Sequence, residues 1–281
     1  METTESRALL AEKSLRKEFH SCLLSKFNKA AADYRLINSG DKIAVCISGG
    51  KDSMLLAKLM QEYKLRSGVD FELRFVTMDP GYSPENRAVI EQNAHLLGIP
   101  LEFFSTDIFA AVDRERTNPC FLCAKMRRKN LYMHAQKMGC NKIALGHHFD
   151  DVIETILMAM IYGGQVQTMM PKLHSENFEG IQLIRPMYLI READIIRWCE
   201  FNGLHFIRCA CKFSESNEAV SASGESGSKR QEIKQLIAQL KQRNPQIEYN
   251  IFRSVENINL NRIISYKDKG VVHSFMDGYI D

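Results

Sequence analysis

A buried strand that runs directly into a glycine-rich turn constrains the fold of this chain most strongly. Residues 42–47 are almost continuously apolar, which is typical of a strand covered on both faces in a parallel sheet. The hexapeptide Ser48-Gly49-Gly50-Lys51-Asp52-Ser53 follows at once, and a helical pattern runs from 52 to 63. Strand, glycine turn and helix in this order predict the first unit of an α/β sheet.

Strand and helix patterns then alternate along the chain, after one or two amphipathic helices within residues 5–36. The predicted strands are 71–78, 101–104, 142–145, 184–187 and 205–208. The predicted helices are 84–97, 125–138, 151–162 and 191–202. This alternation predicts an α/β fold with a doubly wound parallel sheet.

The composition along the chain divides it into four segments. Residues 1–38 form an N-terminal helical segment, and 39–213 form the α/β domain that contains the glycine-rich turn. Residues 214–228 are rich in Ser, Glu and Gly and predict a flexible linker. We expect a C-terminal helix at 229–242 and an irregular tail to Asp281.

Charge and hydropathy exclude several classes of protein. The formal net charge of +3 is too small to indicate a nucleic-acid partner by itself, so such a partner must be argued from local clusters. The first 17 residues are charged and lack the apolar core of a signal peptide. The apolar run 156–162 is far too short to cross a bilayer. We therefore expect a cytoplasmic protein without a membrane partner.

The glycine turn has the chemistry of a phosphate site. Two glycines let the backbone approach an anion, and amides at a helix N-terminus point at it. Lys51 supplies a positive charge, and Asp52 suits Mg²⁺ binding or helix capping. The hexapeptide fits neither the Walker pattern nor the dinucleotide pattern. An ordinary capped Gly-Gly turn is the alternative interpretation.

A second polar segment, Gly146 to Thr155, follows the predicted strand 142–145. Both segments then lie at the carboxyl edge of one sheet, where α/β proteins bind ligands. Asp150 and Asp151 suit magnesium binding or proton removal, although one of them could merely cap the helix. His147 and His148 are either site residues or exposed turn residues.

Eight cysteines in such a chain indicate reduced thiols or a metal site. Four of them, Cys22, Cys46, Cys140 and Cys199, lie in apolar patterns and are expected to be buried structural thiols. The others are Cys120, Cys123, Cys209 and Cys211, candidates for a metal site or, for the first pair, redox chemistry. A basic cluster suited to RNA phosphates follows the first pair and consists of Lys125, Arg127, Arg128 and Lys129. A solvated helix face is its alternative.

Together these motifs resemble the PP-loop ATP pyrophosphatase family, most closely its TtcA-type tRNA 2-thiocytidine synthetases, from about residue 19 to 255. The resemblance includes both polar segments, the first cysteine pair, and the dipeptide Arg191-Glu192. It implies splitting of ATP to AMP and pyrophosphate, with Mg²⁺, during thiolation of tRNA at cytidine 32. The implied ATP-binding residues are Ser48 to Ser53, Met78 and Gly146, and the implied catalytic residues are Asp52, Arg127, Asp150 and Asp151.

The resemblance further implies a 4Fe-4S cluster held by Cys120, Cys123 and Cys209, with Cys211 as the alternative third ligand. Relatives show Pro-Cys-x-x-Cys-Gly near the third ligand, whereas this chain reads Arg208-Cys209-Ala210-Cys211-Lys212 and so lacks one residue and the glycine. The implied partners are tRNA, a sulfur donor such as a cysteine desulfurase or free sulfide, and a second copy in a homodimer. Another PP-loop adenylating ligase and a non-catalytic nucleotide-binding module are the competing hypotheses.

Overall fold

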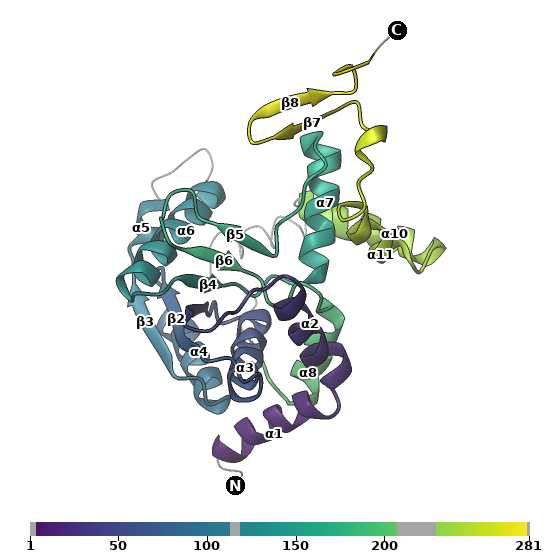
Figure 1. The fold of residues 1–281 in the computed structure, drawn as a ribbon. Helices are drawn as coiled ribbons and strands as arrows, with labels where there is room; N and C mark the ends of the chain where they lie inside the picture. Colours follow the sequence, from purple (N-terminus) through teal and green to yellow (C-terminus); the bar gives the residue numbers. More distant parts are fainter. Residues whose placement is uncertain (1–3, 113–118, 207–228, 280–281) are drawn as a thin grey trace, which may run out of the picture. The chain divides into compact units, whose positions relative to one another are not determined.

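The chain forms two compact units in a computed structural model that describes residues 4–112, 119–206 and 229–279 (Figure 1). Unit 1 consists of Met1–Val152 and Met170–Gly227, and unit 2 of Ile153–Met169 and Ser228–Asp281. The predicted linker 214–228 lies outside the described residues, as do Cys209 and Cys211.

A six-stranded sheet in the order β3-β2-β1-β4-β6-β5 forms the centre of unit 1. The first five strands in this order are parallel, and β5 pairs with β6 in the antiparallel direction. The strands are β1 (Lys42–Cys46), β2 (Glu72–Asp79), β3 (Leu101–Ser105), β4 (Lys142–Ala144), β5 (Lys172–His174) and β6 (Gln182–Ile184). The predicted α/β fold is confirmed, with one antiparallel edge strand that was not predicted.

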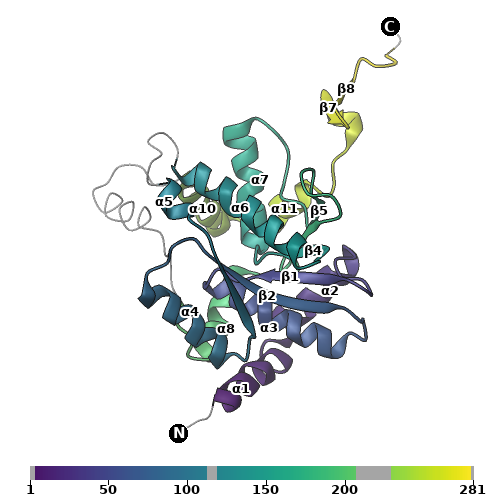
Figure 2. The ribbon, with the colours of Figure 1, turned by 90° about the vertical axis from the view of Figure 1, so that its left-hand side faces the viewer.

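Successive residues of β1 enter two different hydrophobic cores, as the period-2 geometry of a strand requires. Ile43 and Val45 pack on one face and Ala44 on the other. Helices cover both faces (Figure 2), with α1, α2, α3, α4 and α8 on the first and α5 and α6 on the second. The unit 1 helices are α1 (Thr4–Arg16), η1 (His20–Leu24), α2 (Ser25–Asp33), α3 (Lys51–Arg66), α4 (Pro84–Leu96), α5 (Ile108–Val112), α6 (Pro119–Lys137) and α8 (Glu192–Phe201).

The strand order reverses direction beside β1, and this reversal locates the ligand site. From β1 the chain proceeds to β2 and β3 on one side, and β4 and β6 lie on the other side. Ligands of such sheets bind at the carboxyl ends of the strands beside the reversal. The glycine turn follows β1 and the second polar segment follows β4, so both motifs lie at this point.

Unit 2 contains secondary structure where the sequence predicted an irregular tail, so that prediction is wrong. It contains the later turns of α7 (Phe149–Gly163), then α10 (Lys229–Arg243), α11 (Ile247–Ser254), the short helix η2 (Leu260–Arg262) and a hairpin of β7 (Ser265–Asp268) and β8 (Val271–Ser274). Residues of β7 are all exposed, so the hairpin has no buried alternation that a sequence pattern could reveal. Within unit 2, buried Glu154 pairs with Arg230 and Lys234.

The predicted strand 205–208 is also wrong where it can be assessed. His205 and Phe206 are not in a strand, and residues 207 and 208 lie outside the described part. A side-chain hydrogen bond anchors this segment instead, because Asn93 Nδ2 donates to the carbonyl oxygen of His205 at 2.9 Å. No helix among the described residues is long and apolar enough to span a membrane.

Candidate active site

Hydrogen bonds made by the side chain of Ser53 hold the glycine turn in shape. Gly49 has a φ of +85°, a conformation that favours glycine, and Gly50 is the extended residue before α3. The hydroxyl of Ser53 accepts a hydrogen bond from the backbone N–H of Ser48 at 3.1 Å and donates to the carbonyl of Gly50 at 2.9 Å. The turn therefore presents the first amides of α3 as a preformed anion site.

The second motif touches the first through its backbone. A Cβ atom on Gly146 would lie 3.1 Å from the carbonyl carbon of Asp52 and 3.2 Å from the backbone nitrogen of Ser53. These neighbours are backbone atoms of the first turn of α3, which cannot move aside as a flexible side chain would. A side chain at position 146 would therefore have to displace the backbone of α3 by a few tenths of an ångström, so glycine fits this close approach of the two motifs best.

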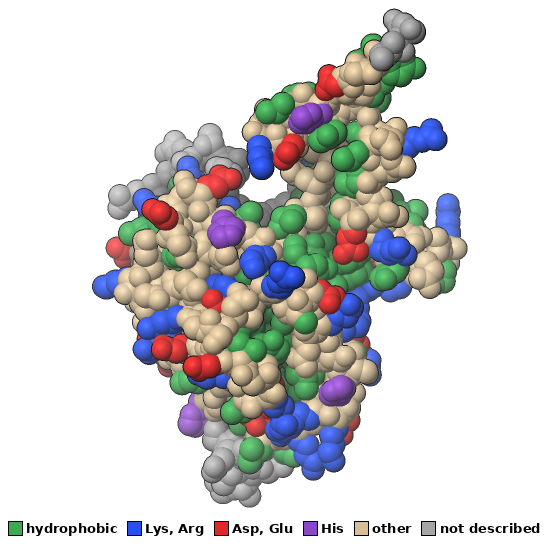
Figure 3. All heavy atoms as spheres, in the orientation of Figure 1, with side chains coloured by type: hydrophobic (Ala, Val, Ile, Leu, Met, Phe, Trp, Pro, Cys, Tyr) green, Lys and Arg blue, Asp and Glu red, His purple; other side chains and the backbone are tan. Residues whose placement is uncertain are grey.

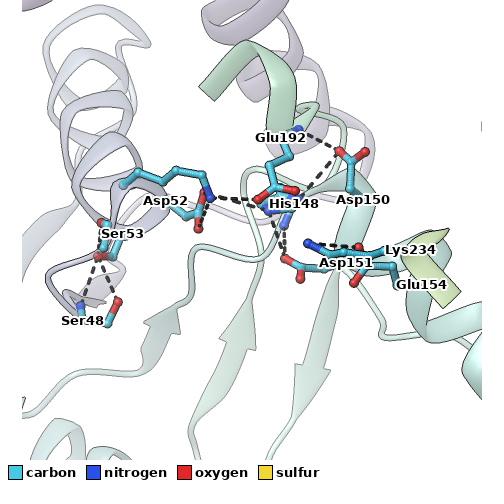
Figure 4. Close-up of polar contacts among 11 residues, drawn as sticks. Ser48, Asp52, Ser53, His148, Asp150, Asp151, Glu154, Glu192 and Lys234 are labelled. Atoms are coloured by element: carbon cyan, nitrogen blue, oxygen red, sulfur yellow. Dashed lines mark hydrogen bonds and ion pairs between the residues drawn. The ribbon is translucent and has the colours of Figure 1, made fainter. Parts of the chain in front are cut away.

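Lys51 is held by two carboxylates. Its Nζ atom lies 2.9 Å from Oε1 of Glu192 and 3.1 Å from Oδ1 of Asp52 (Figure 4). Burial lowers the pKa of Lys51, but the ion pairs with Asp52 and Glu192 outweigh burial and raise the pKa above its usual value. Lys51 therefore stays positively charged in this site.

His148 is a buried side chain among three carboxylates, with a relative exposure of 4%. Its Nε2 atom lies 3.5 Å from Asp151 and 3.9 Å from Asp52, and its Nδ1 atom lies 3.8 Å from Asp150 (Figure 4). The backbone N–H of His148 donates to Asp151 Oδ2 at 3.1 Å, in the manner of a capping box at the start of α7. The interpretation of His148 as an exposed turn residue is wrong.

Asp150 joins the starts of two helices. Its Oδ2 atom accepts the backbone N–H of Glu192, the first residue of α8, at 2.7 Å. Its Oδ1 atom lies 3.2 Å from the guanidinium of Arg191, which also lies over the ring of Phe149. Both oxygens of Asp150 therefore have partners within unit 1, just as both oxygens of Asp52 lie within hydrogen-bond distance of Lys51.

Glu192 is the site residue that sequence reasoning missed. The dipeptide Arg191-Glu192 belonged to the family resemblance, and this was the only signal in the sequence. Glu192 brings α8 to the phosphate site, because its side chain binds Lys51 and its backbone N–H binds Asp150. The structure thus brings together Asp52, Asp150 and Asp151 of the predicted catalytic set.

The first cysteine pair lies in the opening turns of α6, which begins at Pro119, earlier than the predicted helix. Residues 120 and 123 are three apart and so lie on one face of the helix. Cys123 packs against a small core cluster that consists of Ile108, Val112 and Met78, the predicted ATP-binding residue near the end of β2. Because α6 leads into β4, which is parallel to β1, the start of α6 lies at the same sheet edge as the phosphate site.

The basic cluster continues along α6. Lys125, Arg128 and Lys129 are exposed, and Arg127 is half-buried. None of the four forms an ion pair with another described residue. Figure 3 shows Lys and Arg side chains interspersed with Asp and Glu on the face that it displays. On that face, positive charge is not gathered into one broad patch.

The four remaining cysteines are structural, as expected. Cys140 and Cys199 are buried, and Cys22 and Cys46 pack against the two main cores. Burial raises the pKa of each thiol, to about 12 for Cys46 and Cys199. Such thiols stay protonated and are poor metal ligands.

Comparison with known proteins identifies the family. The sequence pattern of the PP-loop domain matches residues 20–218. The chain belongs to the PP-loop family. The phosphate turn after β1 and the polar segment after β4 both lie within the matched residues.

Relatives within this family resemble the chain over nearly its whole length. A tRNA-cytidine(32) 2-sulfurtransferase of Syntrophotalea carbinolica is 35% identical over 248 residues, which cover 86% of this chain and 92% of the relative. A protein of the same description from Coxiella burnetii is 32% identical over 92% of this chain and 96% of its own length. One from Geobacter sulfurreducens is 34% identical over 82% of this chain and 87% of its own length.

A solved structure confirms the fold. The U34-tRNA thiolase NcsA from Methanococcus maripaludis, described with its 4Fe-4S cluster, superposes with a TM-score of 0.63. The match covers 84% of this chain and 79% of that one, at 22% sequence identity. At this identity the likeness concerns the fold alone.

Proposed function

We propose that the protein is an ATP-dependent tRNA sulfurtransferase that replaces the 2-oxygen of cytidine 32 with sulfur. One observation carries the proposal: identity of 32–35% over most of the chain to proteins of that activity. The site supports it, because a preformed anion turn and a cationic Lys51 lie where a PP-loop enzyme binds nucleotide. We place this activity in the cytoplasm.

The reaction has two steps that balance in atoms and charge. The 2-oxygen of cytosine attacks the α-phosphorus of ATP, the bond between the α-phosphorus and its bridging oxygen breaks, and pyrophosphate leaves. A sulfur nucleophile then attacks carbon 2, and the carbon–oxygen bond breaks as AMP leaves. The first step accumulates negative charge on the phosphates. The amides at the start of α3 and the Lys51 ammonium are positioned to stabilise that charge.

Magnesium is proposed to arrive with the nucleotide. Among the described residues, no group of three or more His, Cys, Asp or Glu side chains is arranged to hold a metal ion. Mg²⁺ commonly needs only one or two carboxylates in addition to substrate phosphates. Asp52 suits this role, because it lies in the glycine turn and its Oδ1 atom is shielded from solvent, with Lys51 Nζ at 3.1 Å and His148 Nε2 at 3.9 Å.

The cysteine positions fit a cluster of iron and sulfur. Residues 120 and 123 share one face at the start of α6, and a helix N-terminus favours the thiolate form that binds iron. A bound 4Fe-4S cluster would supply a site for the sulfide nucleophile. Cys120 and Cys123 would hold it, with Cys209 as the third ligand, and Arg127 would lie one turn beyond Cys123.

The test of this function is a nucleoside analysis. The anaerobically purified protein, given Mg-ATP, sulfide and unmodified tRNA, should yield 2-thiocytidine, AMP and pyrophosphate, detected by mass spectrometry and radiolabelled ATP. ADP and phosphate as products would rule out adenylation. Pyrophosphate release without any thiolated nucleoside would indicate another adenylating ligase, and no turnover with any tRNA fraction would indicate a nucleotide-binding module.

Removing the charge of Glu192 should tighten nucleotide binding. In the Glu192→Gln variant, Lys51 loses the carboxylate at 2.9 Å that competes with a phosphate for its ammonium group. We expect a non-hydrolysable ATP analogue to bind about fivefold more tightly by calorimetry, since a partly exposed ion pair contributes roughly 1 kcal/mol. Glu200→Gln, an exposed residue of the same helix, is the matched control. Weaker binding in Glu192→Gln would mean that Glu192 instead orients Lys51 toward the phosphates.

A further inference from the structure

Arg185 lies beside the proposed reaction site, although no motif assigned it a role. It follows Ile184, the last residue of β6, at the carboxyl edge of the sheet. The backbone N–H of Leu145 donates to the carbonyl of Ile184 at 3.0 Å, so Arg185 is next to the strand end that leads into Gly146. The Arg185 backbone N–H donates to Pro171, and its guanidinium donates to the carbonyl of Met170.

The guanidinium of Arg185 is only partly satisfied. Its Nε atom is shielded from solvent and has no hydrogen-bond partner in the described part of the chain. No ion pair joins Arg185 to any described carboxylate. Burial lowers the pKa of Arg185, and Arg128 lowers it too, against Tyr132, Tyr188 and Asp151, which raise it. A partly buried guanidinium without a counter-ion is unfavourable unless an anion binds it.

Arg128 supplies a second guanidinium near Arg185, close enough to lower the pKa of Arg185. Tyr132, one turn later on the same face of α6, belongs to the core cluster of Ile143 and Leu183 and stacks on Phe178. Arg128 is at the middle of α6, and Leu183 lies two residues before Arg185, so the packing of Tyr132 brings the helix beside the end of β6. The like charges of the two arginines repel in the absence of an anion.

We propose that Arg185 and Arg128 together bind one phosphodiester of the RNA strand that carries the target base. A guanidinium group binds phosphate oxygens in a forked geometry. One phosphate between the two arginines would offset the repulsion between their charges and would accept a hydrogen bond from the unpaired Nε of Arg185. This inference rests on the proposed function for the identity of the RNA, and it names residues that orient the substrate beside the nucleotide.

The position of Arg185 favours RNA over ATP as the source of this phosphate. The nucleotide turn follows β1, and β4 separates β1 from β6. Neighbouring strands are about 4.8 Å apart, so the ends of β1 and β6 are roughly 10 Å apart. The nucleotide turn also has its own amides and its own Lys51. A second substrate approaching the nucleotide from the β6 side places its backbone at Arg185.

Binding measurements on the full-length protein test this proposal without turnover. The dissociation constants of tRNA and of Mg-ATP are measured across a salt series for Arg128→Ala, Arg185→Ala, the double variant and Arg185→Lys. Arg197→Ala, an exposed arginine of α8, is the matched control. Thermal unfolding checks each fold, and Arg185→Lys retains the charge in case Arg185→Ala fails to fold.

We expect each alanine variant to bind tRNA roughly ten- to hundredfold more weakly, as for the loss of a charge-assisted hydrogen bond. The affinity of the double variant for tRNA should fall by less than the product of the two single losses. The slope of its tRNA affinity against salt should be lower by about one unit. The tRNA affinity of Arg185→Lys should lie between those of the wild type and Arg185→Ala. Affinity for Mg-ATP should not change in any of them.

Three results would overturn the proposal. If the double variant loses tRNA affinity by the full product of the two single losses, the arginines bind separate phosphates. Weaker ATP binding with unchanged tRNA binding, or no change in the affinity for either ligand, would also contradict it. A failure of the proposed function is distinguishable from these. If tRNA binding depends on the two arginines but no thiolated nucleoside forms, the phosphate site stands and the sulfurtransferase assignment fails. If thiolation occurs and the Arg185 variants bind tRNA normally, the sulfurtransferase assignment stands and the phosphate site fails.

Discussion

Lys51→Ala should reduce ATP cleavage by a factor of about 10² to 10³, the usual effect of deleting one group that stabilises transition-state charge. The Lys51 ammonium lies within hydrogen-bond distance of both Asp52 and Glu192. Without it, both carboxylates lose this positive charge, and the incoming triphosphate meets a more negative site. Both nucleotide binding and pyrophosphate release should therefore fall, as measured with radiolabelled ATP.

The fold should survive the Lys51 substitution. The Lys51 side chain is partly exposed and contacts no core cluster, so the free energy of unfolding should change little. Lys64→Ala is the matched control, because Lys64 lies in the last turn of the same helix and is exposed. Equal loss of activity in Lys64→Ala, or a thermal midpoint that drops in Lys51→Ala alone, would show that the effect is structural.

Cys209→Ala should abolish thiolation and remove most of the iron from the anaerobically reconstituted protein, whereas Cys211→Ala should retain the cluster. Two cysteines of α6 leave a cluster short of one thiolate, and the family resemblance assigns that ligand to Cys209. The chain just before it is held in place, since Phe206 packs against the main core and Asn93 binds the carbonyl of His205. A ligand nearer this anchor is better positioned.

Iron content and acid-labile sulfide provide the readout for the cysteine variants, together with the visible absorption of the cluster. Cys22→Ala is the control, because burial raises the pKa of the Cys22 thiol and keeps it protonated. Loss of the cluster in Cys211→Ala with retention in Cys209→Ala would show that the missing residue in this region has moved the ligand. Full iron in both variants would contradict a third cysteine ligand from this segment.

The sequence predicted the parts of the fold that have strong local patterns. The core strand β1 and the helix α3 were predicted to within a few residues, because both are apolar and are separated by an unmistakable glycine turn. Strand β5 was missed because it has three residues, two of which are exposed. The hairpin of unit 2 was missed for the same reason, since strands with exposed faces show no apolar alternation.

The sequence indicated candidate site residues where they adjoin a glycine turn or a strand end, as for Lys51 and Asp52. The role of Glu192 was not predictable, because the contact joins residues 141 positions apart and depends on how α8 packs. The burial of His148 was equally hidden: a histidine in a turn is exposed or enclosed according to the neighbouring helices. Arg185 belonged to the segment Ile184-Arg185-Pro186 of the family resemblance, but the resemblance gave it no role, because its unpaired Nε is visible only in the folded chain.

The close approach of Gly146 to the backbone of Asp52 and Ser53 has a mechanical consequence. Displacement of either segment presses on the backbone of the other, so we expect the two segments to move together. Lys51 and Glu192, by contrast, contact each other through side-chain atoms, which can change partners by rotating about single bonds. Motions of this kind take picoseconds to nanoseconds, far faster than loop or domain movements.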